Sequence, residues 1–318
     1  VAHSFPTRLS SDLTDLVTPI GPSGSVEVPG LQRLLDRVLA HVQGVLLSGP
    51  DAGNGAALGQ SQRLELLLAA MDRVEGRVPL LVWITEESRE ETLSMLDALE
   101  EGIGNRRYEG PIFWVDTPLV YHSNRGLPQH CQDLTSSASR PLVLFNDPER
   151  VKQAARPLKR ANIRTAVLKE TAHVEGVCGL IFRGSLDRAR NYQKAVRSRS
   201  DFRLYDGDEA QFLSHPSRHG VLSAGANLAP AAWQRITASS LGMDGNGRTY
   251  PDQQKGIWDL GRYLEGLRDL YGEQPSRVIA HALARVGLLE GEPIAPPEDT
   301  PGDPVRGILD LMVRHGDA

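Results

Sequence analysis

The chain has 318 residues, of which 40% are hydrophobic and 24% are charged, as in ordinary globular proteins. A formal net charge of -5 offers no basic surface to nucleic acid, and no apolar run reaches the length of a membrane span. Cys131 and Cys178 lack the spacing of a zinc site or a disulfide framework, which favours a reducing compartment. We therefore expect a cytoplasmic protein that binds neither nucleic acid nor membrane.

Short apolar runs alternate with amphipathic stretches along the first 240 residues. The predicted strands, in chain order, are 13–18, 44–47, 79–84, 111–115, 141–145, 163–168, 202–205 and 220–223. Their apolar residues are mostly consecutive, which is typical of parallel strands covered on both faces. Eight such strands separated by predicted helices favour a (β/α)8 TIM barrel, an α/β fold. An open doubly wound sheet is the alternative that counting strands leaves open.

The pattern changes after residue 240. A turn-rich segment at 243–248 precedes predicted helices at 251–271 and 275–288, and a Pro-rich segment at 293–304 leads to a last helix at 305–313. We predict two parts: residues 1–240 form the barrel that carries the active site, and residues 241–318 form a helical extension packed on it. The extension could supply the contacts of a homodimer or homotetramer.

Several short motifs have simple structural explanations. The glycine-rich segment 49–55 follows the second predicted strand, where it could bind an anion or form a plain tight turn. Segments 206–209 and 244–247 resemble fragments of a calcium loop but lack its full set of ligands, so turns or helix caps are the better interpretation. The sequence has neither HExxH nor GxSxG. We predict no metal site.

Lys169 directly follows the sixth predicted strand. The carboxyl ends of barrel strands surround the active site, and a lysine there can attack a carbonyl to form a Schiff base. Its amine must first lose a proton, so burial or a nearby cation must lower its pKa by roughly three units from about 10.4. Lysines at strand ends are more commonly solvated surface residues.

Taken in order, these features resemble the dihydrodipicolinate synthase / N-acetylneuraminate lyase family of class I aldolases, lyases and hydratases. The resemblance runs from about Leu13 to about Gly291. It is carried by Leu16-Val-Thr-Pro19, Gly53, Thr117-Pro118, Phe145-Asn-Asp-Pro-Glu-Arg150, Leu168-Lys-Glu-Thr171, Gly207-Asp208 and Gly220-Val-Leu-Ser-Ala-Gly-Ala-Asn227.

The resemblance implies that Lys169 forms an imine with a 2-oxo acid, without any further cofactor. It also assigns positions around the substrate to Asp51, Ala52, Gly53, Arg150, Gly207 and Leu222. Arg150 would hold a substrate carboxylate with its fork of donors, unless it pairs with its neighbours Asp147 or Glu149.

The departures from the family pattern affect proton transfer and carboxylate binding. Phe145 stands where the family has a proton-relaying tyrosine, and a phenyl ring neither donates nor accepts a proton. Asp51 and Ala52 replace two carboxylate-binding threonines, and Asp51 would repel a carboxylate. Val120 replaces a second tyrosine, for which the adjacent Tyr121 could compensate.

Two functions follow from this resemblance. The first is a Schiff-base lyase, aldolase or hydratase that acts on a 2-oxo acid or an aldehyde through Lys169 but differs from the standard synthase. Asp51, Tyr121 or Glu86 would then replace the missing acid–base groups. The alternative is a catalytically degenerate member that binds a metabolite or a partner without turnover.

Overall fold

A computed structural model describes residues 11–104, 106–154, 160–216, 219–241, 251–272, 274–290 and 303–318. Its strands are β1 (Ser11–Asp15), β2 (Gly44–Leu47), β3 (Leu80–Trp83), β4 (Ile112–Asp116), β5 (Leu142–Asn146), β6 (Val177–Phe182), β7 (Arg203–Asp206) and β8 (Gly220–Ser223). These strands pair in parallel in sequence order, and β8 returns to β1 with Leu13 opposite Leu222. The predicted closed barrel is therefore confirmed, and the open sheet is excluded.

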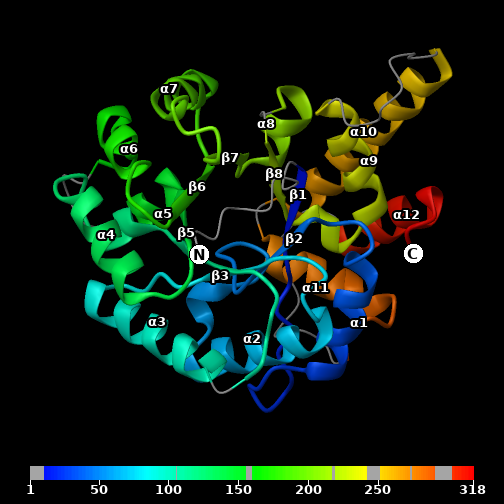
Figure 1. The fold of residues 1–318 in the computed structure, drawn as a ribbon. Helices are drawn as coiled ribbons and strands as arrows, with labels where there is room; N and C mark the ends of the chain where they lie inside the picture. Colours follow the sequence, from blue (N-terminus) through cyan, green and yellow to red (C-terminus); the bar gives the residue numbers. More distant parts are fainter. Residues whose placement is uncertain are drawn as a thin grey trace.

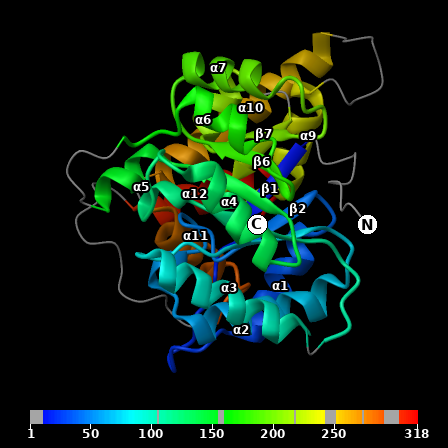
Figure 2. The ribbon, with the colours of Figure 1, turned by 60° about the vertical axis from the view of Figure 1, so that its left-hand side comes forward.

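Helices surround the strands on the outside of the barrel (Figures 1 and 2). The α-helices are α1 (Val28–Val38), α2 (Gln60–Val74), α3 (Arg89–Gly104), α4 (Leu127–Ser137), α5 (Pro148–Gln153), α6 (Thr165–Thr171), α7 (Leu186–Val196), α8 (Glu209–Ser214), α9 (Pro230–Ser240), α10 (Pro251–Tyr271), α11 (Pro275–Arg285) and α12 (Pro304–His315). Short 3-10 turns, η1 (Gly55–Ala57), η2 (Pro118–Val120) and η3 (Gly225–Asn227), follow three of the strands. No described helix combines the length and the apolar composition needed to cross a bilayer.

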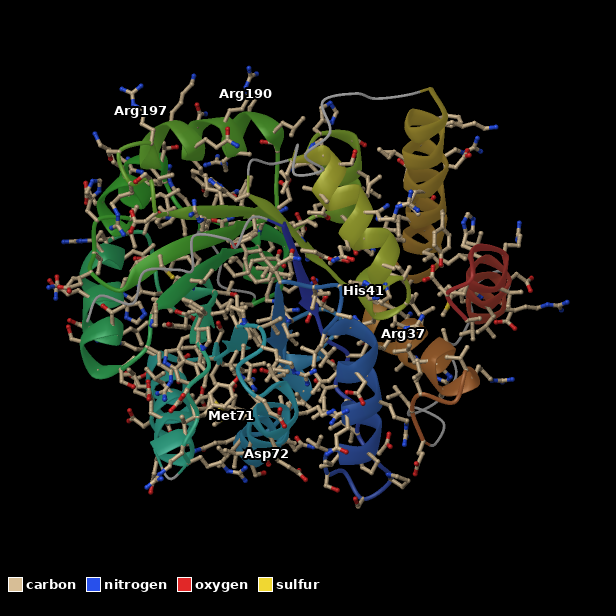
Figure 3. All side chains as sticks on the ribbon, turned by 45° about the vertical axis from the view of Figure 1, so that its right-hand side comes forward. Arg37, His41, Met71, Asp72, Arg190 and Arg197 are labelled. Atoms are coloured by element: carbon tan, nitrogen blue, oxygen red, sulfur yellow. The ribbon has the colours of Figure 1, made fainter. Side chains whose placement is uncertain are left out.

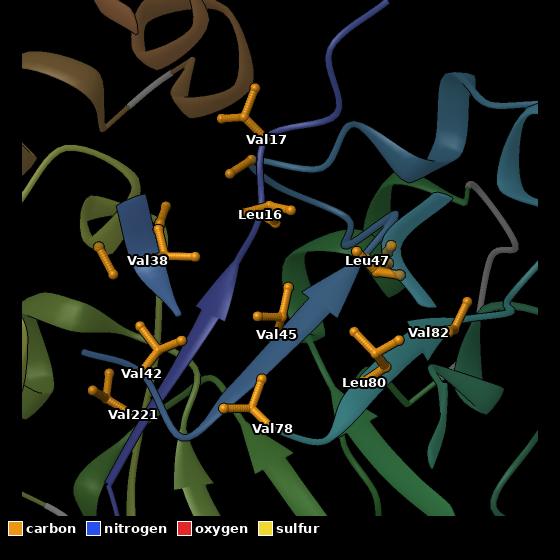
Figure 4. Packing of buried hydrophobic residues seen from close by; sticks show 14 of the residues in the cluster. Leu16, Val17, Val38, Val42, Val45, Leu47, Val78, Leu80, Val82 and Val221 are labelled. Carbon is orange, nitrogen blue, oxygen red and sulfur yellow. The ribbon is translucent and has the colours of Figure 1, made fainter. Parts of the chain in front are cut away.

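The barrel has an inner and an outer apolar core, because successive side chains of a strand point to opposite faces. The inner core contains Leu13, Leu46, Leu81, Trp83, Phe113, Val115, Val143, Phe145, Cys178, Ile181, Tyr205 and Leu222. The outer core lies between the strands and the helices. Figure 4 shows part of it, with Val45, Leu47 and Val82 on β2 and β3. The strands are thus buried on both faces, as the consecutive apolar residues of most of them predict; β1, with the sequence Ser-Asp-Leu-Thr-Asp, is the main exception.

The predicted sixth strand, 163–168, is wrong. Residues Thr165–Thr171 form helix α6, in which Leu168 N donates to Arg164 O at 2.8 Å. The sixth strand of the barrel is β6, the apolar run Val177-Cys-Gly-Leu-Ile-Phe182, which lies between Gly176 and Gly184. The residue that follows the sixth strand is therefore Arg183 and not Lys169.

The helices predicted after residue 240 are present as α10, α11 and α12, while the turn-rich segment 243–248 lies outside the described residues. Helix α10 packs against α8, α9 and α12, and α11 packs against α12.

Figure 3 shows Arg37 and His41 at the C-terminal end of α1. There Arg37 donates to Asn227 O and Leu228 O, and His41 Nδ1 lies 3.0 Å from Gln234 Oε1. The division at residue 240 remains a prediction.

Candidate functional site

The alternation of side chains along the strands places a polar layer directly above the inner core. Two residues beyond the inward-facing Leu13, Phe145, Ile181 and Tyr205 come Asp15, Asp147, Arg183 and Gly207. They lie at the carboxyl ends of β1, β5, β6 and β7, the face on which TIM-barrel active sites are built. The barrel therefore carries two carboxyl groups and a guanidinium at its mouth.

Arg183 holds this layer together. Its Nε donates to Gly207 O at 3.0 Å, and its Nη1 donates to Asp147 Oδ2 at 3.0 Å and to Asp51 Oδ1 at 3.3 Å. Its Nη2 also pairs with Asp51 Oδ2. The guanidinium lies 5.9 Å from the centre of the Phe145 ring. Burial lowers the pKa of Arg183, but the carboxylates of Asp51, Asp147 and Asp208 outweigh it and raise that pKa. Arg183 is thus a fixed cation.

The loop after β2 closes over the carboxylate of Asp15. Asp15 Oδ2 accepts from Ala52 N at 2.8 Å, and Asp15 Oδ1 accepts from Gly53 N at 3.2 Å. A Cβ at Gly49 would stand 1.9 Å from Asp15 Oδ1, so only glycine allows this approach. The segment expected to bind a ligand carboxylate or to form a plain turn is a turn whose N–H groups bind a carboxylate of the protein.

Two neighbouring carboxyl groups have opposite pKa shifts. Burial and the nearby charge of Asp51 raise the pKa of Asp15 to about 8, against the bonds from Ala52 and Gly53. Burial also opposes ionisation of Asp51, but Arg183 and Arg150 outweigh it and lower the pKa of Asp51. Near neutral pH, Asp51 is ionised and Asp15 retains its proton.

A cavity of about 290 Å³ opens above these groups. Its floor comes from residues at or just beyond the ends of β1, β2, β6, β7 and β8: Asp15, Asp51, Arg183, Gly207, Asp208, Glu209, Leu222 and Ala224. Its other wall comes from the end of α10 and the start of α11, with Arg268, Tyr271, Gly272 and Pro275. The C-terminal helices thus form part of the site, which the sequence pattern did not indicate.

Glu209 joins the two walls. Its Oε1 accepts from Ser223 Oγ at 3.0 Å and from Gly225 N at 2.9 Å, and its Oε2 accepts from Tyr271 Oη at 2.8 Å. Burial raises the pKa of Glu209 above its ordinary value, although these three donors act against the shift. Next to it, Asp208 Oδ1 caps α8 by accepting from Ala210 N and Gln211 N. Segment 206–209 therefore contains a helix cap, as expected, and faces the mouth of the barrel.

Among the residues predicted from the sequence, Asp51, Gly207 and Leu222 line the cavity, and Phe145 lies directly below Arg183. Arg150 sits outside this lining. Its Nη2 donates to Pro50 O at 2.7 Å, and its guanidinium lies 5.4 Å from the centre of the Trp83 ring. It therefore holds the loop after β2, and the predicted side-chain pairing with Asp147 or Glu149 is absent from the described contacts.

Tyr121 and Glu86, the predicted replacements for the acid–base groups, lie away from the cavity lining. Tyr121 is buried, its Oη donates to Asp116 Oδ2 at 2.6 Å, and it lies 2.9 Å from His130 Nε2. Burial raises the pKa of Asp116 to about 6. Glu86 pairs with the buried Arg63 at 2.8 Å. Both residues therefore make contacts with the protein itself and do not line the cavity.

Lys169 requires a correction. It is exposed on α6, and its backbone carbonyl oxygen lies 2.7 Å from His173 Nδ1. It does not line the mouth cavity. The other lysines of the described part, Lys152, Lys194 and Lys255, are also exposed, and Lys159 lies outside the described residues. The mouth thus has a guanidinium at the end of its sixth strand, where a lysine was expected.

The signal that locates Arg183 is present in the sequence. Between the predicted strands 163–168 and 202–205 lie 33 residues, enough for a helix, a strand and a second helix. The run 177–182 is apolar, is flanked by glycines and precedes an arginine. Period-2 alternation from Ile181 then directs Arg183 into the barrel mouth.

Comparisons with known proteins agree on one family. Residues 8–292 match the model of the dihydrodipicolinate synthetase family. The 4-hydroxy-tetrahydrodipicolinate synthase of Aromatoleum aromaticum is 26% identical over 289 residues, covering 89% of this chain and 90% of that protein. The enzyme of the same name from Teredinibacter turnerae is 27% identical over 280 residues, with 87% and 88% covered.

Solved structures show the same fold. A dihydrodipicolinate synthase from Thermotoga maritima superposes with a TM-score of 0.79 at 19% identity, covering 98% of this chain and 99% of that one. The 4-hydroxy-tetrahydrodipicolinate synthase from Methylacidiphilum fumariolicum SolV gives a TM-score of 0.78 at 22% identity, with 97% and 96% covered. From the family match over most of its length, the chain belongs to the dihydrodipicolinate synthetase family.

Proposed function

We propose that this protein binds a small metabolite non-covalently in the mouth of its barrel and forms no imine with it. The observation that carries the proposal is Arg183, which follows the sixth strand and contacts Asp51 and Asp147. An arginine keeps its proton under all ordinary conditions, so it cannot act as the amine nucleophile that a Schiff base requires. This is the non-covalent alternative among the functions expected from the sequence.

The cavity itself supports small-molecule binding. Its volume of about 290 Å³ is close to the lower end of the range for ligand sites, and its lining combines charged groups with apolar ones such as Leu222 and Ala224. It lies at the end of the barrel where ligands bind in this fold. The surrounding ion pairs and the Glu209 bridge hold its walls in place without a ligand.

The competing function, Schiff-base chemistry through Lys169, needs that amine to reach a carbonyl in the cavity. Lys169 is exposed on α6 and does not line the cavity, so its amine is not placed to attack a carbonyl bound there. Phe145 beneath the cavity also offers no proton. Both features favour binding over turnover by the imine route.

Calorimetric titration with pyruvate and a set of small carboxylates, amino acids and aldehydes tests the proposal. We expect saturable binding of at least one compound by the wild type and by Lys169→Ala, and its loss in Ala224→Phe, which fills the cavity. A matched control is Ala231→Phe on the outer helix α9. Binding that survives Ala224→Phe, or that depends on Lys169, would contradict a non-covalent site in the mouth.

A further inference from the structure

The walls of the mouth cavity carry opposite charges. Carboxyl groups line the floor at the strand ends, namely those of Asp15, Asp51, Asp208 and Glu209. The facing wall, where α10 ends and α11 begins, contributes the guanidinium of Arg268. A ligand that fills the cavity therefore meets an acidic surface on one side and a cation on the other.

Arg183 does not make the floor positive. Its single charge is matched against two carboxylates, Asp51 at 3.3 Å and Asp147 at 3.0 Å, so the three groups together carry one net negative charge. Four of its five N–H groups are used in bonds to Asp51, Asp147 and Gly207. Arg183 is therefore poorly suited to hold the carboxylate of a ligand.

Asp208 and Asp15 are the floor carboxyls best placed to receive a positive group. Both capping bonds of α8 are accepted by Oδ1 of Asp208. Asp15 accepts one N–H on each oxygen, and a cation beside it would favour its ionised form. Glu209, by contrast, already accepts three bonds from Ser223, Gly225 and Tyr271.

The facing wall suits an anion for two reasons. Arg268 has an ion pair with the adjacent Asp269 at 3.4 Å, but the Asp269 carboxylate is 73% exposed, so water weakens that pair. Helix α11 also begins at this wall with Pro275, and its N-cap residue Gln274 makes no side-chain capping bond. The N-terminus of an 11-residue helix carries a partial positive charge that adds to that of Arg268.

We propose that the cavity binds a small amino acid as its zwitterion. The ammonium group lies against Asp208 and Asp15, and the carboxylate lies against Arg268 and the N-terminus of α11. This inference rests on the proposed function and names the class of its ligand. A volume of about 290 Å³ has room for a whole free amino acid.

Matched pairs of ligands that differ only in the nitrogen group test the inference. Calorimetric titration of the wild type compares glycine with glyoxylate, L-alanine with pyruvate, and L-aspartate with oxaloacetate; β-alanine, 4-aminobutyrate and propylamine complete the set. We expect at least one amino acid to bind about tenfold or more tightly than its oxo counterpart, because only the amine satisfies the acidic floor.

Three variants localise the two charges. Arg268→Gln should lower the affinity for the amino acid about tenfold and leave the affinity for propylamine unchanged, since it removes only the cation. Asp208→Asn should lower the affinity for both ligands, while asparagine still caps α8. Arg262→Gln is the matched control, because Arg262 lies on the same helix and stacks on Trp258 at 5.2 Å, outside the cavity lining. Circular dichroism and the melting temperature check that each variant folds.

Several outcomes would overturn the inference. They are equal or tighter binding of the oxo acids, binding of no amino acid in the set, and amino-acid binding unaffected by both Arg268→Gln and Asp208→Asn. If Mg²⁺ or Ca²⁺ alone raised the melting temperature of the wild type but not of Asp208→Asn, the ligand of the cavity would be a metal ion and not an amino acid. Non-covalent binding of pyruvate alone would remove this inference but keep the proposed function, whereas a borohydride-trapped pyruvate adduct would remove the proposed function itself.

Discussion

Asp51 and Arg183 form an ion pair across the mouth of the barrel, with Arg183 Nη1 donating to Asp51 Oδ1 at 3.3 Å. Asp51 stands where the sequence resemblance places a carboxylate-binding threonine, and Arg183 follows the sixth strand, where it places a reactive lysine. Without Arg183, the carboxylates of Asp51 and Asp147 would face each other at the mouth with no cation between them. Arg183 pairs with both, so its presence and that of Asp51 are best understood as one change in the site.

Removing Arg183 should destabilise the fold. Arg183→Gln leaves Asp51 and the buried Asp147 without their cation, and removing one partner of a buried ion pair costs about 3–5 kcal/mol. The free energy of unfolding from urea denaturation measures this. In the double variant with Asp51→Asn the loss should be smaller than the sum of the two single losses. Additive losses would mean that the two residues do not interact.

An amine at position 183 should react only when fewer carboxylates surround it. In Arg183→Lys, Asp51 and Asp147 hold the new side chain as an ammonium ion, which is not nucleophilic. In Arg183→Lys with Asp51→Thr, one of these charges is gone. Pyruvate with borohydride should therefore label the double variant more than the single one, as read by peptide mass spectrometry. Equal labelling would show that Asp51 does not control the charge at this position.

Lys169→Ala should have almost no effect. The side chain is exposed on α6, and such substitutions change stability by no more than about 0.5 kcal/mol. The affinity of any ligand of the mouth cavity should also be unchanged, with Lys194→Ala on α7 as the control. A loss of ligand affinity confined to Lys169→Ala would restore the role that the sequence assigned to this lysine.

The pKa of Asp15 predicts a pH dependence of stability. Below about pH 4, Asp15 is protonated in the folded and unfolded chain alike, since its ordinary pKa is 3.8. Between there and its folded pKa of about 8, only the folded state retains the proton. The stabilising contribution of Asp15 to the free energy of unfolding is therefore complete at low pH and is lost as the pH rises to about 8.

Asp15→Asn isolates this effect from other titrations, such as that of Asp116. The difference in unfolding free energy between wild type and variant should change across pH 4–8 and be level above it. The exposed Asp310→Asn serves as the control. A difference that stays constant across the whole range would mean that Asp15 ionises in the folded state as it does in water.

Most strands of the barrel could be predicted because they are unbroken apolar runs in the sequence. Such runs arise because each of these strands is buried on both faces. It fails at residues 163–168, where Ile163, Val167 and Leu168 look like part of a strand but belong to the approach and the body of a short helix. Because of that error, Lys169 on an exposed helix was predicted to follow the sixth strand, whereas the residue that follows it is Arg183.

The candidate site was predictable only where it depends on local sequence. Asp51 and Gly207 follow strand ends in the chain and Leu222 lies near the end of β8, so their place at the mouth could be expected. Arg268 and Tyr271 reach the cavity from the C-terminal helices through packing of α10 on the barrel, which no local pattern encodes. The bond between Tyr271 and Glu209 spans 62 residues for the same reason.

In the part of the chain that the structure describes, the mouth holds a fixed guanidinium and no lysine lines it. The most direct measurement is the intact mass of the wild-type protein after incubation with excess pyruvate and sodium borohydride, followed by peptide mapping. We expect an unchanged mass, while Arg183→Lys with Asp51→Thr, treated in parallel, shows that the chemistry works. A stoichiometric pyruvate adduct on any lysine of the wild type, Lys159 and Lys169 included, would contradict it.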